Sequence, residues 1–242
     1  MFSPTYLKTI HNQLSAILNH AVNMYGLKDN VARKAGTMGK EENKEMEFWT
    51  QEEFQAFLEC VADKPISYYA FEILYWTGIR EGELLALTPG DFNFEKKTLR
   101  INKSYQRLEG KDVITDPKTP KSNRTIVMPD FLTIEMEDFI KSIYGIKMDD
   151  RIFTISKSYL HHEMDRGAKL AGVKRIRIHG LRHSHISLLI NLGFSALAIG
   201  ERVGHEAVDI TYRYAHLFPT VQTDMAAQLE TEREALVDVR KE

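Results

Sequence analysis

Hydrophobic residues recur every three to four positions over residues 3–25, the spacing that places them on one face of an α-helix. Ser3 and Pro4 suit the N-cap and the first helical position, and Gly26 suits the end of the helix. After a short polar stretch, residues 39–48 are charged and lack any periodicity. The pattern therefore predicts an amphipathic helix followed by a linker.

A second unit begins at Trp49, where Thr50 and Glu53 form a T-x-x-E capping box ahead of apolar residues at helical spacing. The segments SYYAFEILYWTG and REGELLAL predict two more helices, which end at Gly78 and before Pro89. The segments TLRINKSY, DVITD and RTIVMP, separated by polar turns, predict strands. Helical patterns then return at about residues 130–143, 156–171, 179–192, 195–203, 207–217 and 220–237.

These elements predict a mainly α protein with one small antiparallel sheet inserted near the middle, an α+β fold. Residues 1–38 are too few to bury a core of their own. They either pack on another surface or end a domain that begins in a longer protein, and we favour the second. The predicted organisation is residues 1–38, a linker at 39–48, and a main domain at 49–242.

Composition narrows the class of protein. The hydrophobic share of 43% is ordinary for a soluble globular protein. No stretch approaches the roughly 20 apolar residues of a membrane span, and the N-terminus lacks the features of a signal peptide. The single cysteine, Cys60, excludes an intrachain disulfide and a cysteine-rich zinc site. We expect a cytoplasmic protein with no membrane partner.

Charge is distributed unevenly. The net charge of −2 argues mildly against nucleic-acid binding. Residues 96–126, however, hold nine basic residues against three acidic ones. This predicts a positive face that follows a phosphate backbone, with Lys103, Lys121 and Arg124 as candidate DNA-binding residues. The alternative is a set of solvated loops and strand edges.

Several basic and hydroxyl side chains have the chemistry to bind and attack a phosphodiester without a metal. Arginine forks match phosphate oxygens, and a phenol is a competent nucleophile once its proton has an acceptor. The candidates are Arg80, Lys118, His179, Arg182, His205 and Tyr214.

Local context gives each candidate a functional and a structural interpretation. Arg80 begins a helix in which Glu83 can hold its guanidinium, and this can equally be a plain surface pair. His179 and Arg182 share a helical face at i and i+3. Tyr212 and Tyr214 cannot face the same way on a helix, and such a pair is usually part of a core. In the turn after the second predicted strand, the residues do not distinguish Lys118 from Lys121.

A metal site receives little support. His179 and His183 have the i,i+4 spacing of two zinc ligands on one helix. The chain has no H-E-x-x-H motif, and its cysteine is not close to these histidines in the sequence. We predict no metal and no cofactor.

In type and order, these residues resemble the catalytic set of the tyrosine recombinases, the phage and transposon integrase family. The resemblance covers residues 49 to about 218, and weakly 1–38. The matching segments are TGIREGELLAL, the K-T step of the hairpin, HGLRHSH, VGHE and the Y-A-H-L ending. The resemblance places the nucleophile on Tyr214 rather than Tyr212 and the family's lysine on Lys118.

The resemblance implies site-specific DNA recombination through a covalent 3′-phosphotyrosine. Arg80 and Arg182, with His205, would stabilise the transition state. Lys118 would protonate the leaving 5′-oxygen, and His179 would take the proton of Tyr214.

It also implies double-stranded DNA attachment sites as partners, and a monomer that assembles on DNA, as a tetramer in the synapse. Residues 1–38 would be the end of a helical core-binding domain. Two alternatives remain open: relaxation of DNA by a type IB topoisomerase-like enzyme, and DNA binding without catalysis. A metallohydrolase is a more distant one.

Overall fold

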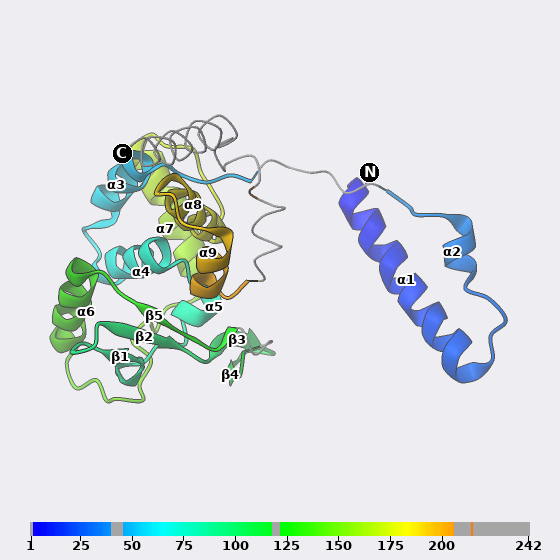
Figure 1. Cartoon of the computed structure of the whole chain (residues 1–242), viewed down its shortest axis with the longest axis horizontal. Coiled ribbons are helices and arrows are strands. Elements are labelled where there is room, and N and C mark those ends of the chain that lie inside the picture. The colour runs from blue at the N-terminus through cyan, green and yellow to red at the C-terminus, as the bar shows by residue number, and fades with distance from the viewer. Residues whose placement is uncertain (1, 40–45, 118–121, 206–213, 215–242) are drawn as a thin grey trace, which may run out of the picture. The chain divides into compact units, whose positions relative to one another are not determined.

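The computed structural model describes residues 2–39, 46–117, 122–205 and 214. The chain divides into two compact units, Met1–Met46 and Glu47–Glu242 (Figure 1). None of the helices in these described ranges is long and apolar enough to cross a membrane.

The smaller unit is built on α1 (Pro4–Tyr25), whose two ends agree with the prediction. The Ser3 side chain accepts a hydrogen bond from the Tyr6 amide, and Gly26 ends the helix in the left-handed conformation at φ 70°. A short helix, α2 (Val31–Ala35), was not predicted. Its N-cap, Asn30, also donates from Nδ2 to the Ser15 carbonyl at 2.9 Å, so α2 depends on a contact with α1 that its own five residues do not reveal.

The larger unit is mainly helical, and the predicted capping box of Thr50 and Glu53 is present at its first helix. The predicted stop at Gly78 is also confirmed. The segment REGELLAL was predicted as one helix, but its helix ends at Leu84 and tighter turns carry the chain onward. The helices are α3 (Gln51–Val61), α4 (Pro65–Thr77), α5 (Glu81–Leu84), the 3₁₀ turn η1 (Pro89–Asp91), α6 (Asp130–Ser142), α7 (Lys157–Ala171), α8 (Ile178–Asn191) and α9 (Ala196–Val203).

Within the described ranges, the strands form two antiparallel sheets rather than the single sheet predicted. The predicted strand TLRINKSY is divided at Asn102 and Lys103, which belong to neither strand, and the Lys103 ammonium contacts Asp91 at 2.5 Å. One sheet has the order β1-β2-β5, from β1 (Phe92–Asn93), β2 (Thr98–Ile101) and β5 (Arg124–Val127), and the other pairs β3 (Ser104–Leu108) with β4 (Lys111–Thr115). Figure 1 shows the strands gathered on one side of the helices. The predicted helices at 207–217 and 220–237 lie outside the described residues, apart from Tyr214, which is helical.

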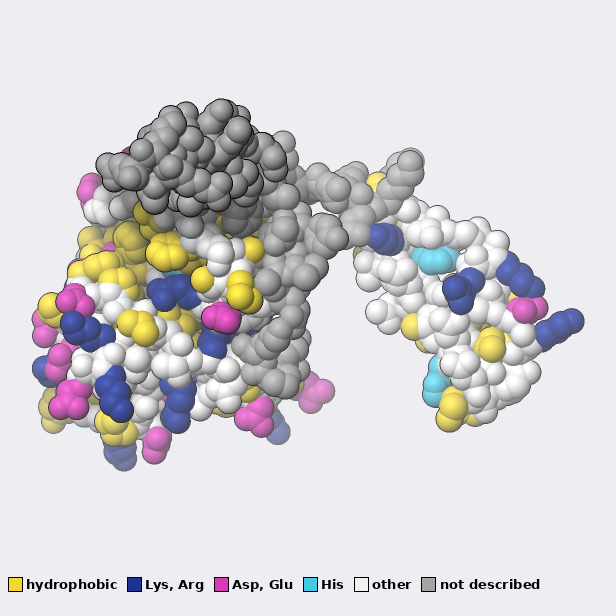
Figure 2. Space-filling model, in the orientation of Figure 1, with side chains coloured by type: hydrophobic (Ala, Val, Ile, Leu, Met, Phe, Trp, Pro, Cys, Tyr) yellow, Lys and Arg dark blue, Asp and Glu magenta, His cyan; other side chains and the backbone are white. Residues whose placement is uncertain are grey.

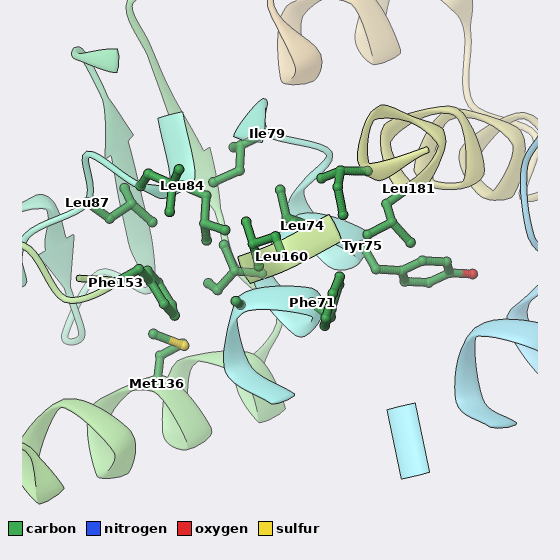
Figure 3. Packing of buried hydrophobic residues seen from close by; sticks show 14 of the residues in the cluster. Phe71, Leu74, Tyr75, Ile79, Leu84, Leu87, Met136, Phe153, Leu160 and Leu181 are labelled. Carbon is green, nitrogen blue, oxygen red and sulfur yellow. The ribbon is translucent and has the colours of Figure 1, made fainter. Parts of the chain in front are cut away.

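The core of the larger unit joins nearly every helix. Figure 3 shows side chains of α4, α5, α6, α7 and α8 meeting there, among them Leu74, Leu84 and Leu181. Removing this apolar surface from water is the main force that holds the unit together, and the packed core fixes the ends of α4 and α8 on which the site depends.

Glu72 is an acidic residue inside this helical layer. It lies on α4 with only 5% of its surface exposed. Burial, reinforced by the charge of Glu135, raises the pKa of Glu72 to about 7. A carboxyl group that is harder to ionise in the folded chain than in the unfolded chain stabilises the fold at low pH, and this contribution is lost as the pH rises through the folded pKa.

We therefore expect the free energy of unfolding to fall by about 2 kcal/mol between pH 5.5 and 8 through this one group, since each pKa unit corresponds to about 1.4 kcal/mol. Glu72→Gln should remove that part of the pH dependence and stabilise the protein at pH 8. Urea unfolding at both pH values measures the difference. An equal pH slope in the two proteins would contradict the assignment.

Candidate active site

Glu83 is the buried carboxylate around which the site is organised. It lies on α5, three residues after Arg80, and accepts from Arg80 Nη1 at 2.8 Å and from the Arg80 backbone amide at 2.8 Å. The predicted i,i+3 contact is confirmed. Arg80 keeps 35% of its side-chain surface exposed, so it is held by Glu83 and still partly open to solvent.

Arg124 contacts the same carboxylate from β5. Its Nη1 and Nη2 donate to the two oxygens of Glu83 at 3.2 and 2.9 Å, and its Nε donates to the Arg202 carbonyl at 2.9 Å. Burial alone would raise the pKa of Glu83, but the hydrogen bonds and charge of Arg124, together with those of Arg80, hold it below its usual value. Glu83 is therefore ionised at neutral pH and fixes two guanidiniums at once.

Arg182 lies on α8 and is only 1% exposed. Its Nη1 donates to the Gly78 carbonyl at 2.5 Å, and its Nη2 donates to the Val203 carbonyl. Burial, then the charges of Arg80 and Arg124, lower the pKa of Arg182 to about 9. The guanidinium is still charged at neutral pH. Both carbonyls lie at the C-terminal ends of helices, where the backbone dipole favours a cation.

The C-terminal end of α9 brings the two predicted arginines together. Arg80 Nη2 donates to the Gly204 carbonyl at 3.4 Å, next to the Val203 carbonyl that Arg182 uses. Two guanidiniums, those of Arg80 and Arg124, thus bind one carboxylate, and that of Arg182 interacts electrostatically with all three groups. The excess of positive charge in a largely buried setting suits an anion with several oxygens, such as a phosphate.

The histidines and the tyrosine form a second group beside the arginines. His179 is exposed at the start of α8, and its ring lies edge-on to the ring of His183, with the ring centres 4.9 Å apart. His183 Nδ1 shares a hydrogen bond with the hydroxyl of Tyr214, which is only 1% exposed. His205 follows Gly204, which ends α9 in the left-handed conformation at φ 70°. The predicted end of this helix, at about residue 203, is confirmed.

The predicted DNA-binding residues lie in different surroundings. Lys103 Nζ contacts Asp91 at 2.5 Å and Thr88 at 3.1 Å, and Arg124 is 6% exposed against Glu83. Each is engaged with an acid of the domain, and their role in DNA binding stays a prediction. Lys118 and Lys121 lie outside the described residues. The face seen in Figure 2 carries basic and acidic side chains intermixed.

No sequence pattern singled out His185, which packs against Gly78 and contacts Arg202. His185 is 2% exposed, and its Nε2 accepts from Arg202 Nε at 3.1 Å. Burial, then the charges of Arg202 and Arg182, lower the pKa of His185 to about 3, so its ring is neutral. A Cβ atom on Gly78 would lie 2.6 Å from this ring, so the close packing requires glycine at the turn whose carbonyl holds Arg182.

Metal ligation finds no support within the described part of the chain, which holds no group of three or more His, Cys, Asp or Glu residues placed to bind an ion. His179 and His183 are neighbours as their i,i+4 spacing predicts, but His183 is hydrogen-bonded to Tyr214. The arrangement combines fixed guanidiniums with a phenol in contact with an imidazole. A tyrosine that attacks a phosphodiester needs these groups.

Comparison with known proteins agrees with this class of site. Residues 47–220 match the model of the phage integrase family, and the chain belongs to that family. The resemblance expected from the sequence is confirmed.

Two curated relatives are the ICEBs1 integrase of Bacillus subtilis (strain 168), 32% identical over 243 residues, and a XerC-like tyrosine recombinase of Caldanaerobacter subterraneus subsp. tengcongensis, 27% identical over 255 residues. The matches cover 93% and 92% of this chain. The chain spans 65% of the length of each relative.

Solved structures share the fold. The integrase of transposon Tn1549, in complex with a circular intermediate DNA, superposes with a TM-score of 0.75 at 21% identity, over 96% of this chain and 80% of that one. A lambda integrase dimer bound to a COC′ core site gives a TM-score of 0.58 at 17% identity, over 82% of this chain and 71% of that one. The α+β fold predicted from the sequence is that of the tyrosine-recombinase catalytic domain.

Proposed function

We propose that this chain is the catalytic part of a tyrosine-type site-specific recombinase that integrates a mobile element into DNA. The observation that carries the proposal is the pair of Arg80 and Arg124 bound to Glu83, together with Arg182, which interacts electrostatically with them and with the buried Tyr214. Cleavage of a phosphodiester by a tyrosine needs both a fixed positive site that binds the phosphate oxygens and a nucleophile that attacks the phosphorus.

Arg182 has an unused donor for a phosphate oxygen. Among the described residues, its buried Nε has no hydrogen-bond partner, and a buried donor left unpaired costs roughly 1–3 kcal/mol. A phosphate oxygen would remove that cost. Arg80, with its more exposed side chain, would meet the phosphate first, and the two forks would together stabilise the extra negative charge of the transition state. His205 would be a further donor.

The reaction transfers the phosphate from one oxygen to another without loss of bond energy. The hydroxyl oxygen of Tyr214 attacks phosphorus, the P–O5′ bond breaks, and Lys118 gives a proton to the leaving 5′-oxygen. A new 5′-hydroxyl then attacks the 3′-phosphotyrosine and releases the tyrosine. No water and no nucleotide cofactor enters, because the covalent intermediate keeps the energy of the broken bond. The family resemblance assigns removal of the Tyr214 proton to His179.

Double-stranded DNA attachment sites are the proposed partners. The related structures support this, since the Tn1549 integrase and XerH are described in complex with transposon or difH DNA. We further propose that residues 1–38 end a core-binding domain, that 39–48 link it to the catalytic domain at 49–242, and that monomers assemble into a tetramer on DNA. Because it would act on DNA, we also propose a cytoplasmic location for the protein.

A nicked suicide substrate carrying the candidate attachment site tests the proposal. When the strand is cut close to the nick, the short fragment that carries the new 5′-hydroxyl dissociates, so the covalent complex accumulates and survives a denaturing gel. We expect this complex to form in the presence of a metal chelator, because arginines supply the positive charge. Binding without any adduct would favour the non-catalytic alternative, and relaxation of plasmids that lack the site would favour the topoisomerase-like one.

A further inference from the structure

We propose that His183 is a further catalytic residue, which holds the hydroxyl of Tyr214 and accepts its proton during attack. The inference rests on the proposed function. It departs from the role that the family resemblance assigns to His179. The observation behind it is the direct hydrogen bond between His183 Nδ1 and the phenol oxygen, the atom that must form the bond to phosphorus.

The burial of Tyr214 limits where its hydroxyl proton can go. The side chain of Tyr214 is 1% exposed, so bulk water has little access to it. A phenol in that position becomes a nucleophile only if a nearby group takes its proton. An imidazole suits this task, because it accepts and returns protons near neutral pH. In the tautomer that carries its hydrogen on Nε2, His183 Nδ1 is the acceptor for the tyrosine hydroxyl.

The backbone around His183 is fixed on both sides. Arg182 is tied to the carbonyls of Gly78 and Val203. On the other side, Ser184 Oγ accepts from the Trp49 amide at 2.8 Å and donates to the Gly180 carbonyl at 3.0 Å. His183, half-buried between two anchored residues, therefore presents its ring at a set position, as proton transfer in a catalytic site requires.

Arg182, in the same turn of α8 as His183, interacts with the negative charge that develops on Tyr214. Tyr214 and Arg182 interact electrostatically, since the tyrosine charge acts to raise the pKa of Arg182. The same coupling stabilises a phenolate as it forms. His183 thus removes the proton while Arg182 compensates the charge left behind, and the two residues are neighbours in the chain.

The step balances. The O–H bond of Tyr214 breaks and its proton moves to His183 Nδ1. The bond from the tyrosine oxygen to phosphorus forms as the P–O5′ bond breaks, and the leaving 5′-oxygen receives a proton from Lys118. In the reverse direction, His183 returns its proton to the tyrosine oxygen when a 5′-hydroxyl displaces it.

Substitution of His183 and His179 separates the two assignments. Single-turnover cleavage of the suicide substrate is measured for His183→Ala, His183→Asn and His179→Asn in the 242-residue chain, each with tyrosine or with a fluorinated, more acidic tyrosine at position 214. We expect His183→Ala to cleave about 10²–10⁴ times more slowly, and the more acidic phenol to restore much of the rate. Asparagine can keep the hydrogen bond but cannot carry the proton, so His183→Asn should also be slow with tyrosine.

His162→Ala is the matched control, because His162 is an exposed histidine on α7. It should cleave like the unchanged chain, and thermal unfolding checks that each variant is folded. If His183→Ala misfolds, His183→Asn decides. A His183→Asn rate equal to that of the unchanged chain would overturn the proposal, as would restoration by the acidic phenol in His179→Asn instead. Absence of any adduct from the unchanged chain would reject the proposed function itself, and this inference with it.

Discussion

Tyr214→Phe is expected to bind attachment-site DNA as the unchanged chain does and to form no covalent adduct at all. Phenylalanine keeps the buried ring and removes only the oxygen that would attack phosphorus. The variant also loses the hydrogen bond to His183, which we expect to cost about 1 kcal/mol of stability. A gel-shift assay and a denaturing gel on the same samples measure binding and covalent capture.

Tyr212→Phe is the control that gives this experiment its meaning. Tyr212 is two residues away, and its structure lies outside the described residues, so its exclusion rests on the Y-A-H-L match and on helical geometry. It should form the adduct at an undiminished rate. Peptide mapping that located the DNA on Tyr212 would overturn the assignment of Tyr214.

The sequence predicted those features that depend on nearby residues. Ser3, Gly26 and the capping box of Thr50 and Glu53 set helix ends through bonds within a few residues, and each was placed correctly. The contact between Arg80 and Glu83 was also within reach, because it joins two positions of one helical turn.

Contacts between residues far apart in the sequence could not be predicted from such local patterns. Arg124 looked like one member of a basic run for DNA, but β5 turns it inward to Glu83, which precedes it by 41 residues. His183 was considered only as a metal ligand, since nothing near it in the sequence indicates that Tyr214, 31 residues later, would meet its ring. Where TLRINKSY divides between two sheets, Lys103 likewise contacts Asp91, which lies 12 residues before it.

Replacement of either predicted arginine is expected to slow cleavage by about 10²–10³ while DNA binding changes far less, because each guanidinium would act mainly on charge that appears in the transition state. Arg80→Ala and Arg182→Ala test the loss of charge and fork together. Arg80→Lys tests the fork alone, since a lysine keeps the charge but cannot donate to Glu83 and to a phosphate in the same planar arrangement.

Arg182→Lys is expected to be as damaging as Arg182→Ala, for a reason specific to this structure. The guanidinium bridges the carbonyls of Gly78 and Val203, and the single nitrogen of a lysine ammonium, which has no planar fork, cannot serve both and also reach a phosphate. The buried carbonyl left without a donor should lower the free energy of unfolding by roughly 1–3 kcal/mol. Arg80, with 35% of its side chain exposed, should show the loss of rate with a smaller loss of stability.

Arg175→Ala is the matched control, because Arg175 lies outside the basic run 96–126, between α7 and α8, with 42% of its side chain exposed and paired with Asp165. It should cleave at the rate of the unchanged chain. Single-turnover rates at saturating DNA separate the chemical step from binding, and thermal unfolding separates both from misfolding. Near-normal cleavage by Arg80→Ala would exclude it from the phosphate site. The buried cluster would then act through Arg182 alone, with Arg80 and Arg124 serving only to hold Glu83 in place.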